Sequence, residues 1–174
     1  MSDFKKLFDD TQAAFREQPE AAAATFSVES RLNSGFNTTV KTRQFSFDAD
    51  EPEGLGGTDK APNPVEYLLA ALSTCQEITY RLYADAMRIP VDGISVKLEG
   101  DLDLRGFLGV DDSVRPGYLS ITGTVTLESS ASEQDLARLK KAVDAHCPVL
   151  DGLRNPTPVE LTINHAEISA AAAE

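Results

Sequence analysis

The chain has 174 residues, 41% of them hydrophobic and 25% charged, which is typical of one globular domain with a sizeable core. Its formal charge of −12 argues against nucleic acid or an anionic membrane surface as a partner, because both require clustered Lys and Arg. No apolar run approaches the ~20 residues of a membrane span, and the first residues lack a secretory signal, so we expect a cytoplasmic protein.

The first half is predicted to begin with an amphipathic helix over residues 3–16, which ends near Pro19 and is followed by a connector. Alternating apolar residues predict a half-buried strand over 26–32 and a second strand from Phe36. In the second strand the alternation of apolar, inward-facing residues shifts its register between Val40 and Phe45, which predicts a β-bulge at Arg43. Residues 48–63 are rich in acidic residues, Gly and Pro, and are expected to form a loop.

The second half is predicted to start with a long helix from Pro64 to about Arg88. Strands are expected over 94–104 and 119–127, a helix over 132–146 and a last strand over 159–163. This order favours an α+β fold in which helices cover curved antiparallel sheet.

The start of the long helix carries a capping pattern. Asn63 is the expected N-cap, Pro64 takes the first helical position, and the Glu66 carboxylate can reach back to the cap N–H. Capping alone is therefore a sufficient role for Glu66. Cys75 falls on an apolar stripe at three-to-four spacing and, taken alone, is more often a small core residue than a nucleophile.

The chain has two cysteines, and cytoplasmic thiols are kept reduced, which disfavours a structural disulfide. Cys147 precedes Pro148 at the expected N-terminus of a short helix, where N–H groups and the helix dipole favour a thiolate. We therefore expect Cys147 to be more accessible and more acidic than Cys75. The two histidines and the cysteines lack the paired spacing of zinc motifs, so no metal or other cofactor is expected.

Two segments resemble the OsmC/Ohr family, the osmotically inducible and organic hydroperoxide resistance proteins. They are residues 56–75, with a Gly-rich loop and an Asn-Pro helix start before Cys75, and residues 146–149, with the Cys-Pro pair. The likeness covers roughly residues 25–168. It divides the chain into an N-terminal helix and connector (1–24), an OsmC-like domain (25–168) and a flexible tail (169–174). The N-terminal segment is either an extra helix packed on the dimer or a mobile appendage.

The resemblance implies an intertwined homodimer that acts as a two-cysteine peroxidase. Cys75 would attack the O–O bond of an organic hydroperoxide and become a sulfenic acid, Cys147 would condense with it to a disulfide, and an external dithiol would restore both thiols. A different reading stays open, in which a non-peroxidatic OsmC-like protein binds a small apolar ligand at the dimer interface.

The resemblance also implies an arginine from the early strands, paired with a glutamate, that activates the first cysteine. Arg31 and Arg43 are the candidates for the arginine, and Glu66 for the glutamate, although it stands one residue closer to Cys75 than in the best-studied branch. Nine residues of helix place Glu66 and Cys75 on opposite sides and ~13.5 Å apart along the axis. Glu66 is therefore expected to act through an arginine or across a dimer interface.

Overall fold

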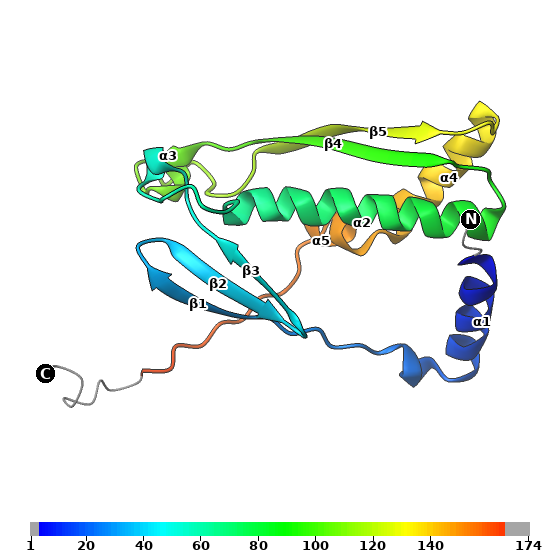
Figure 1. Ribbon diagram of the computed structural model, residues 1–174, viewed down its shortest axis with the longest axis horizontal. Helices are drawn as coiled ribbons and strands as arrows, with labels where there is room; N and C mark the ends of the chain where they lie inside the picture. Colours follow the sequence, from blue (N-terminus) through cyan, green and yellow to red (C-terminus); the bar gives the residue numbers. More distant parts are fainter. Residues whose placement is uncertain (1–3, 166–174) are drawn as a thin grey trace, which may run out of the picture.

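The protein, seen in a computed structural model that describes residues 4–165, is arranged around one long helix (Figure 1). The helices are α1 (Phe4–Glu17), α2 (Pro64–Met87), α3 (Leu104–Phe107), α4 (Glu133–His146) and α5 (Pro148–Arg154), with 3-10 turns η1 (Pro19–Ala22) and η2 (Glu53–Leu55). The strands are β1 (Glu29–Ser34), β2 (Asn37–Thr42), β3 (Phe45–Ala49), β4 (Gly93–Asp101) and β5 (Ser120–Glu128). Antiparallel β1–β2–β3 forms one sheet and antiparallel β4–β5 another, which confirms the α+β class.

Helix α2 begins and ends as its sequence predicts. The Asn63 side chain accepts from the Glu66 N–H at 2.9 Å, and the Glu66 carboxylate accepts from the Asn63 N–H at 2.8 Å, which completes the capping box. Arg88 closes the helix in the left-handed conformation, with φ 55°, before the Ile89-Pro90 pair. Among the described helices, none has both the length and the apolar character needed to cross a membrane.

The loop that leads into α2 is organised by a buried carboxylate. Asp50 accepts hydrogen bonds from the Glu51 N–H at 2.9 Å, from the Thr58 N–H at 3.1 Å and from the Thr58 hydroxyl. The hydroxyl contact is the main cause that lowers the pKa of Asp50, against the opposing effect of burial. Gly57 packs so closely that a Cβ there would lie 1.7 Å from the Glu51 carbonyl oxygen. The Gly-Thr pair before the helix therefore has a packing reason.

The core lies where α2 meets α4 and the β4–β5 sheet. It is formed by Tyr80, Ala84, Ile89, Val91, Leu139 and Val143. The buried positions of α2 are Leu72, Gln76, Thr79, Tyr80 and Ala84, whereas Cys75 is only partly buried. The buried face is therefore wider than a single stripe, because α4 and the β4–β5 sheet also cover α2 on the Gln76 side.

Replacing Leu139 with alanine is expected to lower the free energy of unfolding by about 2–5 kcal/mol, because the side chain is fully buried and its loss leaves a cavity. Chemical denaturation monitored by circular dichroism measures the change. Val110→Ala, at an exposed loop position, is the control and should stay within about 0.5 kcal/mol of the parent. Equal stability of the two variants would contradict the assignment of the core.

The predicted β-bulge at Arg43 is wrong, since the chain reverses there. Thr42 pairs with Phe45 across a two-residue turn, and Arg43 takes a left-handed conformation with φ 51°. The alternation of apolar residues changes register here because the residues before Arg43 belong to β2 and those after it belong to β3. The predicted strand over 94–104 is also too long, because Asp103 caps α3 by accepting from the Arg105 N–H at 3.0 Å.

The strand predicted over residues 159–163 does not form within the described part of the chain. Its apolar side chains are instead almost fully exposed, at 72% for Val159, 91% for Leu161 and 100% for Ile163. A strand requires a neighbour, and the described residues of the same chain supply none at this position. The predicted flexible tail over 169–174 lies outside the described residues.

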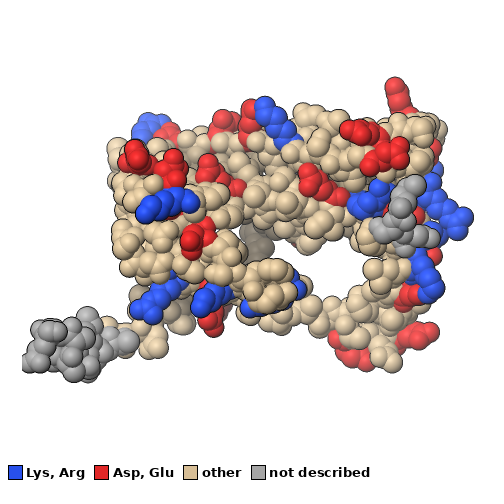
Figure 2. All heavy atoms as spheres, in the orientation of Figure 1, with Lys and Arg blue, Asp and Glu red and all other residues tan. Residues whose placement is uncertain are grey.

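The described residues before β1 form an arm that lies apart from the rest of the molecule over most of its length (Figure 1). Helix α1 runs across the C-terminal end of α2, and the stretch after it leads back to β1 at the other side of the molecule (Figure 1). Phe26 in this stretch is 90% exposed. The space-filling view shows a through-opening framed by α1, this stretch, the three-stranded sheet and α2 (Figure 2).

Candidate active site

The two cysteines, 72 residues apart in sequence, meet inside the helical layer. Their Sγ atoms are 3.3 Å apart and both thiols are free. Cys75 lies in the middle of α2, and Cys147 lies at the corner where α4 ends and α5 begins. The separation exceeds the ~2.05 Å of a disulfide bond and falls in the ~3–3.5 Å range from which two atoms can react. Packing of α4 and α5 on α2 creates this contact.

The expectation that Cys147 is the more accessible thiol is wrong. Cys147 is 1% exposed, whereas Cys75 is only partly buried. The N-terminus of α5 points toward α2 rather than toward solvent, so the residue that caps it is enclosed by three helices. Cys75 is thus the sulfur that an external molecule reaches first.

The environment of Cys75 in this chain disfavours its thiolate. Burial raises the pKa of the Cys75 thiol, and the neighbouring Cys147 raises it further. Hydrogen bonds from the Val149 backbone N–H and from the Thr79 side chain act in the opposite direction. The Val149 N–H belongs to the first turn of α5, where N–H groups have no partner inside the helix. This backbone donor was missed from the sequence, and its signal is the position two residues after Cys147.

Glu66 lies at the start of α2 and is held by its cap. It is exposed, and its carboxylate accepts the Asn63 N–H. The neighbouring residue, Val65, accepts a hydrogen bond at its carbonyl from the Tyr118 hydroxyl at 2.9 Å. Burial raises the pKa of Tyr118, and the charge of Glu66 raises it further. The structure therefore supports the capping role of Glu66 and does not bring it to Cys75 within this chain.

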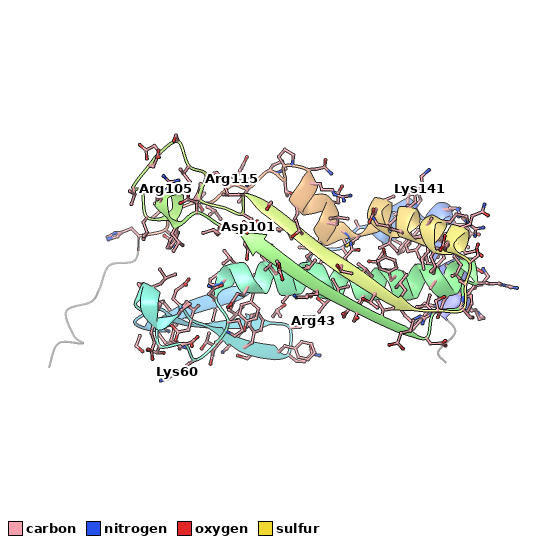
Figure 3. The ribbon with its side chains drawn as sticks, turned by 90° about the horizontal axis from the view of Figure 1, so that it is seen from above. Arg43, Lys60, Asp101, Arg105, Arg115 and Lys141 are labelled. Carbon is pink, nitrogen blue, oxygen red and sulfur yellow. The ribbon has the colours of Figure 1, made fainter. Side chains whose placement is uncertain are left out.

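The two candidate arginines lie on the three-stranded sheet, away from the sulfurs. Arg31 is exposed on β1 opposite Thr39, and the guanidinium carbon of Arg43 is 5.1 Å from the centre of the Phe45 ring. Figure 3 shows Arg43 at the tip of the β2–β3 hairpin, on the other side of α2 from α5. Within residues 4–165 neither arginine is among the groups that shift the pKa of Cys75. Among the described residues, no Lys, Arg or His contributes to the shift in the pKa of Cys75.

A cavity of about 480 Å³ lies between α2, α5 and the β4–β5 sheet, and it is lined by Gln76, the residue after Cys75, rather than by either cysteine. Its walls are mainly apolar, and Leu72, Ile121 and Leu150 are among the residues that line it. The buried Nε2 atom of Gln76, the residue after Cys75, has no hydrogen-bond partner within the described residues. Over the same range no three His, Cys, Asp or Glu side chains are placed to hold a metal ion.

Comparison with known proteins places these features in a family. The family model described as OsmC-like protein matches residues 57–162, which include both cysteines. No curated protein matches the sequence.

Three solved structures illustrate the likeness in fold. An OsmC-like protein from Mycoplasma pneumoniae is 22% identical, with 76% of this chain and 89% of that chain covered and a TM-score of 0.66. An organic hydroperoxide resistance protein OsmC from Legionella pneumophila is also 22% identical, with coverage of 76% and 91% and a TM-score of 0.57. An organic hydroperoxide resistance protein from Elizabethkingia anophelis is 19% identical, with coverage of 78% and 91% and a TM-score of 0.55. At these identities the similarity concerns the fold.

Proposed function

Because the chain belongs to the OsmC-like family, we propose that it is a thiol-dependent peroxidase that reduces organic hydroperoxides through Cys75 and Cys147. The observation that carries the proposal is the 3.3 Å separation of two free sulfurs. Two similar structures bear the name organic hydroperoxide resistance protein, which gives the class of substrate. Cytoplasmic conditions, which keep thiols reduced between turnovers, suit this chemistry.

The proposed reaction has three steps: oxidation of Cys75, formation of the disulfide, and reduction of the disulfide. The Cys75 thiolate attacks one oxygen of the hydroperoxide, the O–O bond breaks, and the alkoxide leaves as an alcohol after taking a proton. The resulting sulfenic acid is attacked by the Cys147 sulfur, which forms the disulfide and releases water. An external dithiol then reduces the disulfide and is itself oxidised. The partial exposure of Cys75 and the burial of Cys147 suit this order of events.

One equivalent of tert-butyl hydroperoxide tests the proposal. The reduced protein should lose both free thiols and gain an intramolecular disulfide, measured by thiol titration and by mass spectrometry of the peptides that contain Cys75 and Cys147. The proposal fails if both thiols remain free while a known peroxidase consumes the same reagent.

The active form in this proposal is an intertwined homodimer. Large apolar side chains stay exposed on the three-stranded sheet, on α2 and in residues 159–163. A second cavity, of about 630 Å³, lies between the sheet and the start of α2 and is lined by Leu32, Phe36, Phe47 and Tyr67. Exposed apolar surface on this scale marks an interaction site. Residues 159–163 alternate like a strand but have no neighbour strand in the described part of the chain, and β1 has a free edge with which such a strand can pair. A second copy of the chain supplies the segment that this edge lacks.

Replacing Ile78 with glutamate is expected to weaken the dimer at least about a hundredfold, because burying an unpaired carboxylate costs several kcal/mol. Ile78 is 68% exposed on α2 in the single chain. Sedimentation velocity over a range of concentrations measures the effect. Lys97→Gln, on the exposed outer face of β4, lowers the charge by the same amount and should leave the dimer intact. A parent protein that is monomeric at every concentration would contradict the proposed assembly.

The activating cation is proposed to reach Cys75 from the second copy. Arg31 and Arg43 both lie on the sheet whose apolar face is open to a partner. A guanidinium near the sulfur lowers the pKa of a thiol and offsets the effect of burial. Glu66 is proposed to pair with that arginine across the interface.

We expect either Arg31→Ala or Arg43→Ala to raise the apparent pKa of Cys75. Loss of the cation leaves burial to dominate, so thiolate forms only at higher pH, and the rate at neutral pH falls about tenfold for each unit of increase. Alkylation of Cys75 by iodoacetamide, followed by mass spectrometry as a function of pH, measures the midpoint. Arg16→Ala, on α1, is the control. Unchanged midpoints in both variants would remove the arginine from the mechanism.

A second candidate function is the binding of a small apolar molecule by a member that does not turn over peroxide. It is favoured by the raised pKa of Cys75 and by the apolar cavity with the unpartnered Gln76 Nε2 atom. In that case an environment-sensitive apolar dye should bind Cys75→Ser as tightly as the parent protein. The parent itself would then show no dithiol-dependent loss of hydroperoxide.

A further inference from the structure

Three aromatic rings connect the N-terminal helix to the residue beside Cys147. The rings of Phe8 on α1 and Tyr83 on α2 meet edge to face, with centroids 5.4 Å apart. Tyr83 also stacks on the His146 ring, with 5.1 Å between the ring centroids and 30° between the ring planes. His146 is the last residue of α4, and Cys147 follows it directly. The contacts thus join α1, α2 and α4 at one end of the molecule.

Polar contacts join helices α1 and α2 next to this row of rings. Helix α1 is fixed to α2 where the Phe4 N–H donates to the Asp85 carboxylate at 3.2 Å. The same carboxylate pairs with Arg81, whose guanidinium also donates to the Val91 carbonyl at 2.6 Å. The partial burial of Tyr83 is sufficient to raise the pKa of its hydroxyl. Edge-to-face and offset-stacked pairs are the arrangements that aromatic rings prefer, so both ring contacts stabilise the way the three helices meet.

The position of Cys147 depends on the corner between α4 and α5. The His146 Nδ1–H donates to the Ala142 carbonyl at 2.8 Å, and the Cys147 N–H donates to the Val143 carbonyl at 3.0 Å. The Cys147 carbonyl in turn accepts from the Asp151 N–H at 3.0 Å. His146 is exposed and Cys147 is buried, and the two are consecutive residues of this corner, so a contact that restrains the His146 ring also restrains the backbone that carries the sulfur.

We infer that Tyr83 is a positioning residue that, by stacking on His146, holds the Cys147 sulfur within reaction distance of Cys75. The inference rests on the proposed peroxidase chemistry and concerns the step in which Cys147 displaces water from the Cys75 sulfenic acid. That displacement depends on keeping the two sulfurs near 3.3 Å, because a loss of alignment lowers the effective concentration of the attacking group. Reaction of Cys75 with hydroperoxide precedes this step and does not require Cys147. Phe8 gives the N-terminal helix, which lies outside the family match, a part in the same arrangement.

The test separates the two chemical steps. Reduced protein receives one equivalent of tert-butyl hydroperoxide in the presence of dimedone, which traps sulfenic acid, and mass spectrometry measures the ratio of the Cys75 adduct to the disulfide. Tyr83→Ala should form the disulfide about tenfold more slowly, and adduct should accumulate, while the first equivalent of hydroperoxide disappears at the parental rate. Tyr83→Phe keeps the ring and should restore the parental ratio. Phe8→Ala should shift the ratio in the same direction by a smaller factor.

Controls keep this inference distinct from the proposed function. Phe15→Ala changes an exposed phenylalanine on the same helix and should leave the ratio unchanged. His146→Ala removes the other member of the stack, so it should reproduce the effect of Tyr83→Ala even where the latter variant folds poorly. If the parent protein itself forms neither adduct nor disulfide, the proposed function fails. If the parent reacts and both ring-removing variants keep its ratio, the positioning role is refuted while the peroxidase proposal stands.

Discussion

Replacing Cys75 with serine is expected to abolish dithiol-dependent reduction of organic hydroperoxide, with a loss of at least about a thousandfold. A serine hydroxyl stays protonated at neutral pH, and its oxygen cannot be oxidised to the intermediate that Cys147 attacks. The measurement is the steady-state loss of tert-butyl hydroperoxide with dithiothreitol as the reductant. Because serine is close to cysteine in size, the helix and its packing should be preserved.

Ser73→Ala provides the matched control for this substitution. Ser73 lies two residues earlier on α2, and its hydroxyl donates to the Ala70 carbonyl at 3.0 Å. Its removal should leave the rate within about twofold of the parent, as is usual for surface substitutions away from a reacting group. Turnover by Cys75→Ser at a rate similar to the control would show that the sulfur has no part in the chemistry.

Replacing Cys147 with serine is expected to leave the reaction with the first equivalent of hydroperoxide unchanged and to slow all later turnovers. Cys75 should consume the first equivalent of hydroperoxide at the parental rate, because the attacking sulfur is unchanged. Without the second thiol 3.3 Å away, the sulfenic acid persists, and excess peroxide carries it to sulfinic acid, which dithiols do not reverse. We expect steady-state turnover to fall at least about tenfold and the oxidised Cys75 peptide to accumulate in the mass spectrum.

The outcome for Cys147→Ser distinguishes two roles for the buried thiol. Full turnover without over-oxidation would mean that the external reductant attacks the sulfenic acid directly and that Cys147 is a packing residue. The parent protein at the same peroxide concentration serves as the control. Its disulfide should form before any sulfinic acid is detected.

Local signals in the sequence predicted much of the fold. The Asn63, Pro64 and Glu66 pattern gave the start of α2, and the Pro148 position gave the start of α5 next to Cys147. These features depend on interactions between residues close in sequence, which is why a reading of the chain captures them. The end of α4 at His146 was predicted on the same basis.

The errors concern features that depend on the rest of the fold. The turn at Arg43 lacks the glycine or asparagine that usually marks a tight hairpin, so the sequence alone predicts a bulge there. Residues 159–163 carry the pattern of a strand, but a strand forms only beside a neighbour. The burial of Cys147 depends on where the N-terminus of α5 points, which composition and spacing do not specify.

The candidate site divides in the same way. The two cysteines were identified in the sequence, and their contact was expected only from the family resemblance, since nothing in a spacing of 72 residues requires it. The hydrogen bond from the Val149 N–H to Cys75 comes from the main chain, which any residue type provides. The sequence shows that Arg31, Arg43 and Glu66 have the residue types needed to activate a thiol. Within the described single chain, none of them is brought to Cys75.

The through-opening below α2 bears on how the proposed dimer would fold (Figure 2). If a second copy of the chain passes through this opening in the proposed dimer, α1 can dock on α2 only after the two chains have met. A step that needs two molecules makes the refolding rate depend on protein concentration, unlike the first-order kinetics of small single domains. For such a dimer, dilute chains would keep the apolar face of the three-stranded sheet uncovered until they pair, and aggregation would compete with pairing during slow refolding.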